Sequence, residues 1–140
     1  MAYFPRTLTS EKTSRWDMGS WHANYVVIQL GGNDFSTKPR AEEQRFISAY
    51  NALLNRLFNV YPDVKIILIT TSIGIEQRYK QKIIKHQEAI PERKGRIAHV
   101  MLPNNLAKTG CNWHPSTHDH QIIAKLLIDK ILKFGEWTPN

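Results

Sequence analysis

The sequence contains little cysteine and no long apolar run. Its single cysteine, Cys111, cannot form an intramolecular disulfide, so nothing in the composition indicates an oxidising compartment. No segment approaches the roughly 20 apolar residues that cross a membrane, and the first twelve residues lack the apolar stretch of a signal peptide. As the chain stands, we expect a cytoplasmic protein without a membrane partner.

Acidic residues are scarce relative to basic ones. There are 12 Asp and Glu against 19 Lys and Arg, which gives a net charge of +7, and much of the excess lies in residues 78–96. Such clusters can bind phosphate backbones, but a solvated helix face explains them more simply, because net charge reports on solubility rather than on function. We therefore expect no nucleic-acid partner.

The length and composition fit one folded domain. With 140 residues, 41% of them hydrophobic and only 7 Gly and 7 Pro, the chain matches neither disordered nor collagen-like proteins. We expect a single domain whose core lies in residues 16–134, preceded by an irregular segment at residues 1–15. A short turn or helical turn is expected between Trp16 and Trp21.

Apolar periodicity predicts the fold class. Short runs of β-branched and other apolar residues indicate buried strands at residues 25–30, 64–70 and 97–102. Helical spacing of apolar residues predicts helices near residues 39–60, 75–90 and 117–134. This alternation is typical of an α/β fold with a parallel sheet covered on both faces, in which functional groups gather at the carboxyl ends of the strands.

The loop after the first predicted strand reads Gly-Gly-Asn-Asp-Phe at residues 31–35. Its two glycines permit a tight turn with positive φ and leave Asn33 projecting from the strand end with little steric cover. An asparagine amide in this place can donate to an oxyanion without titrating. The alternative is an Asx-type turn, in which Asn33 or Asp34 binds only its own backbone.

The loop before the last predicted helix carries three histidines within residues 110–120. Ser116 followed by Asp119 is typical of a helix start, with Ser116 as N-cap and Asp119 as its acidic partner three residues on. This places His114 just outside the helix, where a histidine can act as a general base. A lone histidine in a loop is otherwise a surface residue.

Together these loops resemble two conserved blocks of the SGNH (GDSL-type) hydrolases. The resemblance covers residues 16–134, and residues 33–36 (Asn-Asp-Phe-Ser) and 110–116 (Gly-Cys-Asn-Trp-His-Pro-Ser) are most similar to carbohydrate esterase family 2, enzymes that remove acetyl groups from plant polysaccharides. The resemblance implies a flavodoxin-like three-layer α/β/α sandwich that uses no cofactor and no metal. The substrate would be an acetylated carbohydrate or another small ester, and members of the family are often secreted.

The resemblance also implies roles for four residues. Asn33 would donate its side-chain amide to the tetrahedral oxyanion, and His114 would be the base that activates a serine. Gly32 and Trp113 would line the substrate-binding pocket.

This sequence departs from the family pattern in three ways. It contains neither the Gly-Asp-Ser block that carries the family's nucleophile nor the glycine block that supplies a second oxyanion donor. The third departure is Cys111, which stands where many SGNH enzymes place a carboxylate, three residues before the histidine. Among the serines, Ser36 and Ser116 are interpreted as caps, and Ser72 lies outside any nucleophile-elbow pattern.

From these departures we expect a chain that belongs to an esterase family but does not hydrolyse esters by itself. The strand bearing the nucleophile would pair beside residues 25–30, and without it that edge would favour self-association. Whether the sequence is a gene fragment, one piece of a split enzyme or a pseudoenzyme stays open.

Three other functions compete with esterase activity. The histidines of residues 114–120 with Asp119 are candidates for a metal site, although the helix start separates His114 from the others and no second ligand element is evident. Cys111 next to His114 is a candidate nucleophile, although adjacency in sequence does not establish the geometry. A module that binds acetylated glycans through Trp113 without cleaving them is the third.

Overall fold

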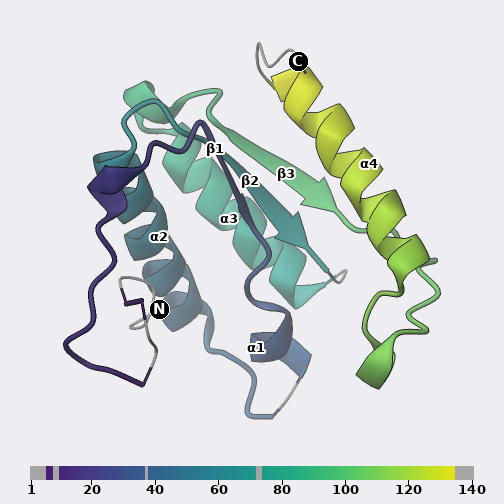
Figure 1. The fold of residues 1–140 in the computed structure, drawn as a ribbon. Coiled ribbons are helices and arrows are strands. Elements are labelled where there is room, and N and C mark those ends of the chain that lie inside the picture. Colours follow the sequence, from purple (N-terminus) through teal and green to yellow (C-terminus); the bar gives the residue numbers. More distant parts are fainter. Residues whose placement is uncertain (1–5, 8–9, 37, 72–73, 135–140) are drawn as a thin grey trace.

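The computed structural model describes residues 6–7, 10–36, 38–71 and 74–134, and its centre is a three-stranded parallel sheet (Figure 1). The strands are β1 (Tyr25–Ile28), β2 (Lys65–Thr70) and β3 (Ile97–Met101), in the order β1-β2-β3. Tyr25 lies opposite Lys65, and Ile66 lies opposite Ile97. The parallel sheet and its three strands are confirmed, each strand being slightly shorter than expected.

The helices follow the predicted order. Besides four α-helices, the described residues include three single turns of 3-10 helix, and the bounds in chain order are η1 (Met18–Ser20), α1 (Gly32–Ser36), α2 (Glu43–Val60), α3 (Ile75–Glu88), η2 (Pro91–Arg93), η3 (Cys111–Trp113) and α4 (Thr117–Phe134). The turn expected between Trp16 and Trp21 is η1. None of the described helices is long and apolar enough to cross a membrane.

Two details of the helices differ from the prediction. Helix α2, expected to start near residue 39, begins at Glu43. The Glu42 carboxylate caps its first turn, because it accepts hydrogen bonds from the N–H groups of Gln44 and Arg45 at 3.1 and 3.2 Å. The Gly-Gly-Asn-Asp segment, expected as a tight loop, continues from Gly32 as the short helix α1, which spans residues 32–36.

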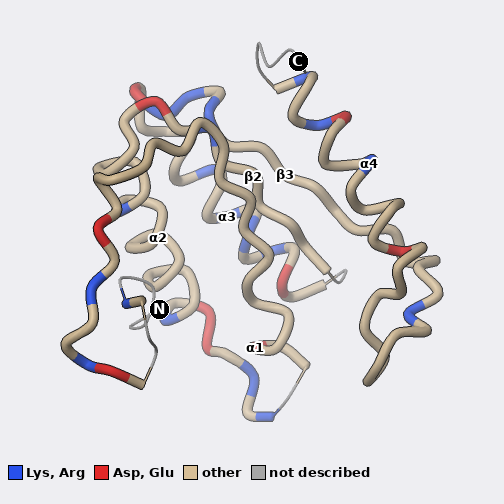
Figure 2. The backbone as a smooth tube through the Cα atoms, viewed as in Figure 1, with Lys and Arg blue, Asp and Glu red and all other residues tan. Residues whose placement is uncertain are grey.

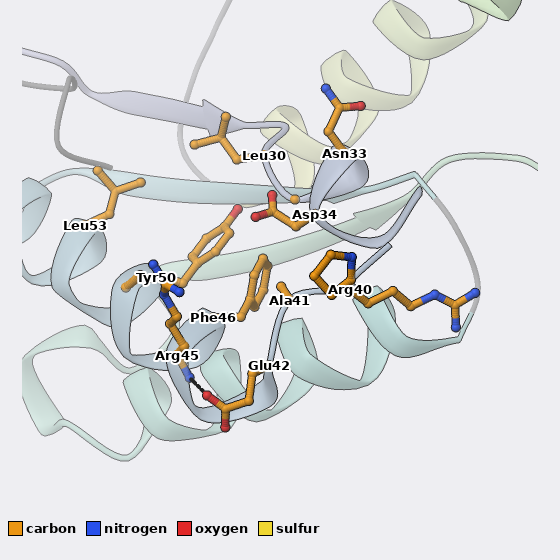
Figure 3. Close-up of a pocket in the computed structure, with 13 residues that line it drawn as sticks. Leu30, Asn33, Asp34, Arg40, Ala41, Glu42, Arg45, Phe46, Tyr50 and Leu53 are labelled. Atoms are coloured by element: carbon orange, nitrogen blue, oxygen red, sulfur yellow. Dashed lines mark hydrogen bonds between the residues drawn. The ribbon is translucent and has the colours of Figure 1, made fainter. Parts of the chain in front are cut away.

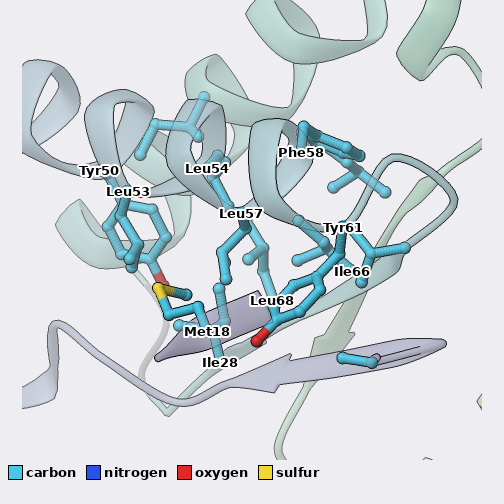
Figure 4. Packing of buried hydrophobic residues seen from close by; sticks show 14 of the residues in the cluster. Met18, Ile28, Tyr50, Leu53, Leu54, Leu57, Phe58, Tyr61, Ile66 and Leu68 are labelled. Atoms are coloured by element: carbon cyan, nitrogen blue, oxygen red, sulfur yellow. The ribbon is translucent and has the colours of Figure 1, made fainter. Parts of the chain in front are cut away.

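The helices cover the sheet in two layers. Alternate side chains of β2 point to opposite faces, so Ile66 and Leu68 join the cluster formed with α2 and α3, whereas Ile67 and Ile69 pack with residues of α4. Figure 4 shows the first cluster, in which α2 buries its apolar stripe against the strands. This arrangement is the predicted α/β/α sandwich, with β2 buried at its centre.

Strand β1 is an edge of the described sheet. Its Val27 side chain is 41% exposed, whereas Ile67, its partner in register on β2, is fully buried. Figure 1 shows the reason, because α4 lies beside β3 and not over β1. The edge and part of one face of β1 therefore remain open to an additional element.

Much of the basic stretch at residues 78–96 is structural. Lys80 is fully buried, and the Arg93 and Arg96 guanidinium groups lie 4.7 and 5.2 Å from the centre of the Phe58 ring. Arg96 also donates to the Val64 carbonyl at 2.9 Å. Figure 2 shows the remaining basic residues distributed over the chain rather than gathered in one cluster.

Candidate active site

The two predicted site segments lie at the same end of the sheet, where the carboxyl ends of the strands meet. Figure 1 shows α1 at the carboxyl end of β1, and the segment that leads into α4 follows the carboxyl end of β3. Since the strands are parallel, both segments emerge at the edge where α/β proteins place their functional groups. The common edge therefore agrees with the predicted location of the site.

Gly31 and Gly32 allow the first segment to approach its neighbours closely. Gly31 has a φ of +113°, and a Cβ atom there would lie 3.0 Å from the Cζ atom of Phe46. A Cβ on Gly32 would lie 3.1 Å from the Thr71 Oγ1 atom, although the φ of Gly32 is not positive. The turn with positive φ that the two glycines permit is therefore present at Gly31, and at both positions a Cβ atom would crowd its nearest neighbour.

Asn33 and Asp34 lie in the first turn of α1. The Asp34 N–H donates to the Gly31 carbonyl at 3.1 Å, and the Ala41 N–H donates to the Asp34 carbonyl at 2.9 Å. These bonds fix the segment on both sides of Asn33. In Figure 3 the Asn33 amide points away from Tyr50 and Phe46, whereas the Asp34 carboxylate points toward Tyr50.

A buried ion pair between Lys80 and Glu76 lies next to the segment that contains Gly32. Lys80 Nζ donates to the Glu76 carboxylate at 2.7 Å and to the Ile69 carbonyl at 2.5 Å, and both side chains are completely shielded from solvent. The other Glu76 oxygen accepts from Thr71 Oγ1 at 2.9 Å. The network thus joins α3 to the end of β2, directly beside Gly32. Nothing in the sequence predicts that this ion pair is buried.

A pocket of about 1030 Å³ lies beside β1, α1 and the first half of α2 (Figure 3). Its lining combines charged residues with apolar ones, and includes Leu30, Asn33, Asp34, Arg40, Arg45, Phe46 and Tyr50. The Tyr50 hydroxyl is buried and has no hydrogen-bond partner among the described residues, and burial raises the pKa of this phenol. No residue of the loop before α4 lines the pocket, so this pocket contains Asn33 but not His114.

The histidine loop, residues 108–116, holds His114 outside α4 as predicted. The His114 ring nitrogen Nδ1 lies 3.0 Å from the Cys111 carbonyl oxygen, which also accepts the His114 N–H at 3.1 Å. A carbonyl oxygen can only accept, so Nδ1 carries the proton in the neutral ring and Nε2 is left as the base. The acceptor for the His114 ring is thus a main-chain carbonyl, at the residue where the family resemblance would place a carboxylate.

The histidine loop contains three residues with left-handed backbone. Lys108, Asn112 and Trp113 have φ values of 51°, 53° and 61°, a conformation that costs on the order of 1–3 kcal/mol for residues other than glycine. Gly110 donates its N–H to the His114 carbonyl at 3.0 Å, and a Cβ atom there would lie 2.8 Å from the Pro115 carbonyl oxygen. The Trp113 side chain is 86% exposed, so its ring is available to a ligand.

The predicted cap of the last helix is present. The Asp119 N–H donates to Ser116 Oγ at 3.2 Å, and the Ser116 N–H donates to the Asp119 carboxylate at 2.8 Å, which is a reciprocal capping box. The same carboxylate accepts the N–H groups of Ala107 and Lys108 at 2.9 and 3.0 Å. These donors, chiefly the Ser116 N–H, lower the pKa of Asp119 to about 2, although burial opposes the shift.

Neither of the other candidate sites gains support from the geometry. Among the described residues, no group of three or more His, Cys, Asp or Glu side chains is arranged to hold a metal ion. The Cys111 side chain is exposed, and it is the Cys111 carbonyl rather than the thiol that binds His114. The serine candidates serve local roles, since Ser36 Oγ donates to the Asn33 carbonyl at 3.3 Å and Ser116 is the cap. Ser72 lies outside the described residues.

The chain is similar to carbohydrate esterases in sequence. It is 31% identical over 145 residues to the cellulase/esterase CelE of Acetivibrio thermocellus, a match that covers 98% of this chain and 17% of that protein. It is 27% identical over 130 residues to an acetylxylan esterase/glucomannan deacetylase of Cellvibrio japonicus, which covers 84% of this chain and 35% of that protein. The chain therefore spans about a third or less of the length of these relatives. No protein-family model matches it.

The fold supports the same relationship. The chain matches a family two carbohydrate esterase from Clostridium thermocellum, solved in complex with cellohexaose, with a TM-score of 0.82 and 28% identity. That match covers 96% of this chain and 44% of the solved chain. By its fold and by these similarities over nearly its whole length, the chain belongs to carbohydrate esterase family 2 of the SGNH hydrolases.

Proposed function

We propose that these 140 residues supply the oxyanion and base half of an ester-hydrolase site that removes acetyl groups from carbohydrate. The observation that carries the proposal is the bond between His114 Nδ1 and the Cys111 carbonyl, because it leaves Nε2 as the proton acceptor. A serine hydroxyl beside Nε2 would lose its proton to it while its oxygen attacks the acyl carbon.

Asn33 has the complementary role. As the acyl carbon becomes tetrahedral, its carbonyl oxygen gains negative charge, and a preorganised amide donor of this kind contributes about 2.7–4 kcal/mol to the transition state. The bonds that hold α1 between Gly31 and Ala41 supply the preorganisation, because the backbone on both sides of Asn33 is hydrogen-bonded. Gly32 lets this segment lie against Thr71.

The nucleophile is the part that the 140 residues do not supply. Ser36 and Ser116 are engaged in local hydrogen bonds, and no Gly-Asp-Ser sequence occurs. Residues of a catalytic set act as a unit, and loss of the serine alone costs about as much as loss of the whole set, on the order of 10⁶ in turnover. The polypeptide of residues 1–140 therefore hydrolyses acetyl esters at no more than a background rate.

Fusion to a nucleophile-bearing segment tests the proposal. The chain is joined to the upstream part of the catalytic domain of the Acetivibrio thermocellus relative, and turnover of 4-nitrophenyl acetate and of acetylated xylan is measured. Activity is expected only in the fusion, and His114→Ala abolishes it. His118→Ala is the matched control, because His118 is an exposed histidine of α4. Activity that survives His114→Ala, or that both variants lose equally, contradicts the assignment.

Carbohydrate binding without cleavage is a second candidate function, favoured by the exposed Trp113 ring. A flat aromatic face open to solvent is suited to stacking on a sugar ring. Calorimetric titration of the chain with cello-oligosaccharides tests this function. Trp113→Ala removes the binding, whereas Trp21→Ala, at a ring 64% exposed, leaves it unchanged. Binding that is insensitive to Trp113→Ala would show that another surface is responsible.

A further inference from the structure

The Asp119 carboxylate binds both ends of the histidine loop. One oxygen accepts the Ala107 N–H, and the other accepts the Lys108 N–H together with the N–H and hydroxyl of Ser116. Lys108 is the first residue of the loop and Ser116 is the last. A single side chain, 1% exposed, therefore closes a nine-residue loop whose ends both bind it.

A cap for α4 alone would not need this arrangement. The capping box is complete with the reciprocal bonds between Ser116 and Asp119, and the two further donors come from outside the helix. These donors satisfy the carboxylate where it is buried, and the pKa of about 2 means that it stays ionised at neutral pH. The carboxylate thus also binds Ala107 and Lys108, which lie outside the start of α4.

The loop that Asp119 closes also sets the position of His114. Inside it, the Gly110 N–H binds the His114 carbonyl, and the Cys111 carbonyl binds the imidazole. Two of its interior residues, Asn112 and Trp113, adopt left-handed backbone. Such backbone persists only where surrounding contacts hold it, and the bonds to Asp119 are those contacts at the two ends of the loop.

We propose that Asp119 is a positioning residue, which holds the histidine loop closed and thereby fixes the His114 imidazole as its Nδ1–H tautomer with Nε2 as the base. This inference rests on the proposed function for its meaning, since the tautomer matters only if His114 is a base. In this chain the acid acts through the main chain, whereas Cys111 occupies the position of a carboxylate that would touch the ring directly.

The test measures the tautomer of the His114 imidazole and not the esterase activity. Long-range ¹H–¹⁵N spectra of the ¹⁵N-labelled chain distinguish Nδ1–H from Nε2–H imidazole at His114. In the wild type the Nδ1–H form is expected to predominate. Asp119→Asn keeps the side-chain shape but removes the charge and one acceptor oxygen, so the single tautomer is lost and the two forms mix. Asp129→Asn makes the same change at an exposed site of α4 and leaves the spectrum of His114 unchanged.

Ser116→Ala separates positioning from helix capping. It removes the hydroxyl that caps α4, but the N–H groups of Ala107, Lys108 and residue 116 still bind the carboxylate. The Nδ1–H tautomer is therefore expected to survive Ser116→Ala. Loss of the tautomer in this variant as complete as in Asp119→Asn would assign the effect to the cap and overturn the proposal. A folded Asp119→Asn chain that keeps the Nδ1–H form would also overturn it.

If Asp119→Asn fails to fold, amide hydrogen exchange in the wild type tests the proposal instead. The amides of Ala107, Lys108 and Ser116 are expected to exchange much more slowly than unstructured amides, and exchange at unprotected rates would overturn the proposal. Neither measurement uses catalysis. A fixed tautomer without esterase activity in the fusion would therefore reject the proposed function and leave the role of Asp119 standing.

Discussion

Replacing Lys80 by methionine should destabilise the fold more than any surface substitution on the same helix. Lys80 is fully buried, and its ammonium group binds both the Glu76 carboxylate and the Ile69 carbonyl. Lys80→Met keeps the length and the apolar stem of the side chain but leaves the Glu76 charge without its partner. Breaking a buried pair in this way costs about 3–5 kcal/mol, a large part of the roughly 5–15 kcal/mol that stabilise a typical domain.

The control is Lys82→Met in the same helix. Lys82 pairs with Glu43, but the side chains are 60% and 42% exposed, so this ion pair contributes at most about 1 kcal/mol. Urea unfolding followed by circular dichroism gives both free energies of unfolding by linear extrapolation. Equal losses in the two variants would refute the reasoning from burial.

A double variant tests the origin of the loss. Glu76→Leu together with Lys80→Met replaces both charges by apolar groups, and such replacements are often neutral or stabilising because two desolvation penalties are removed. We expect the double variant to recover most of the stability lost in Lys80→Met. A double variant less stable than Lys80→Met would show that the hydrogen bonds to Ile69 and Thr71, rather than the unpaired charge, dominate.

Three further predictions concern packing, pH and the open edge. In urea unfolding, Gly31→Ala should lower the free energy of unfolding by roughly 1–3 kcal/mol more than Gly95→Ala does. Both glycines have positive φ, but only at Gly31 would the added Cβ have a neighbour, Phe46 Cζ, within 3.0 Å, and equal losses would contradict this. The pKa of Asp119 falls from 3.8 to about 2 on folding, so its contribution to stability is complete above pH 3.8 and is lost as the pH falls toward 2; Asp119→Asn should lack this loss, and an unchanged acid profile would contradict it. The chain should self-associate through β1 as its concentration rises in sedimentation velocity, Val27→Lys should weaken the association, and a wild type that stays monomeric would contradict the edge as an interface.

The fold could be predicted because its signals are local. Runs of β-branched residues mark each strand, and the spacing from Ser116 to Asp119 marks the start of α4. Helix α1 was missed because residues 32–36 contain only one apolar side chain, Phe35, and so show no periodicity. The start of α2 was placed too early because the cap is Glu42, a residue type less common at this position than Ser, Thr, Asp or Asn.

The supports of the candidate site could not be predicted because they join distant segments. Glu76 and Lys80 have the spacing of an ordinary exposed helix pair, and only the packing of α3 against β2 buries them. The acceptor for the His114 ring is a main-chain carbonyl, which the amino-acid type at position 111 does not reveal. The bonds from Ala107 and Lys108 to Asp119 span eleven or twelve residues and likewise leave no pattern in the sequence.

The most direct test of the central claim is the turnover of 4-nitrophenyl acetate by the purified 140-residue chain. Under the proposed function the chain supplies a base and an oxyanion donor but no nucleophile, so its rate should not exceed that of a His114→Ala control, and Ser116→Ala should leave it unchanged. Robust turnover that Ser116→Ala abolishes would contradict the account, because it would show that the N-cap of α4 is the nucleophile and that the site is complete.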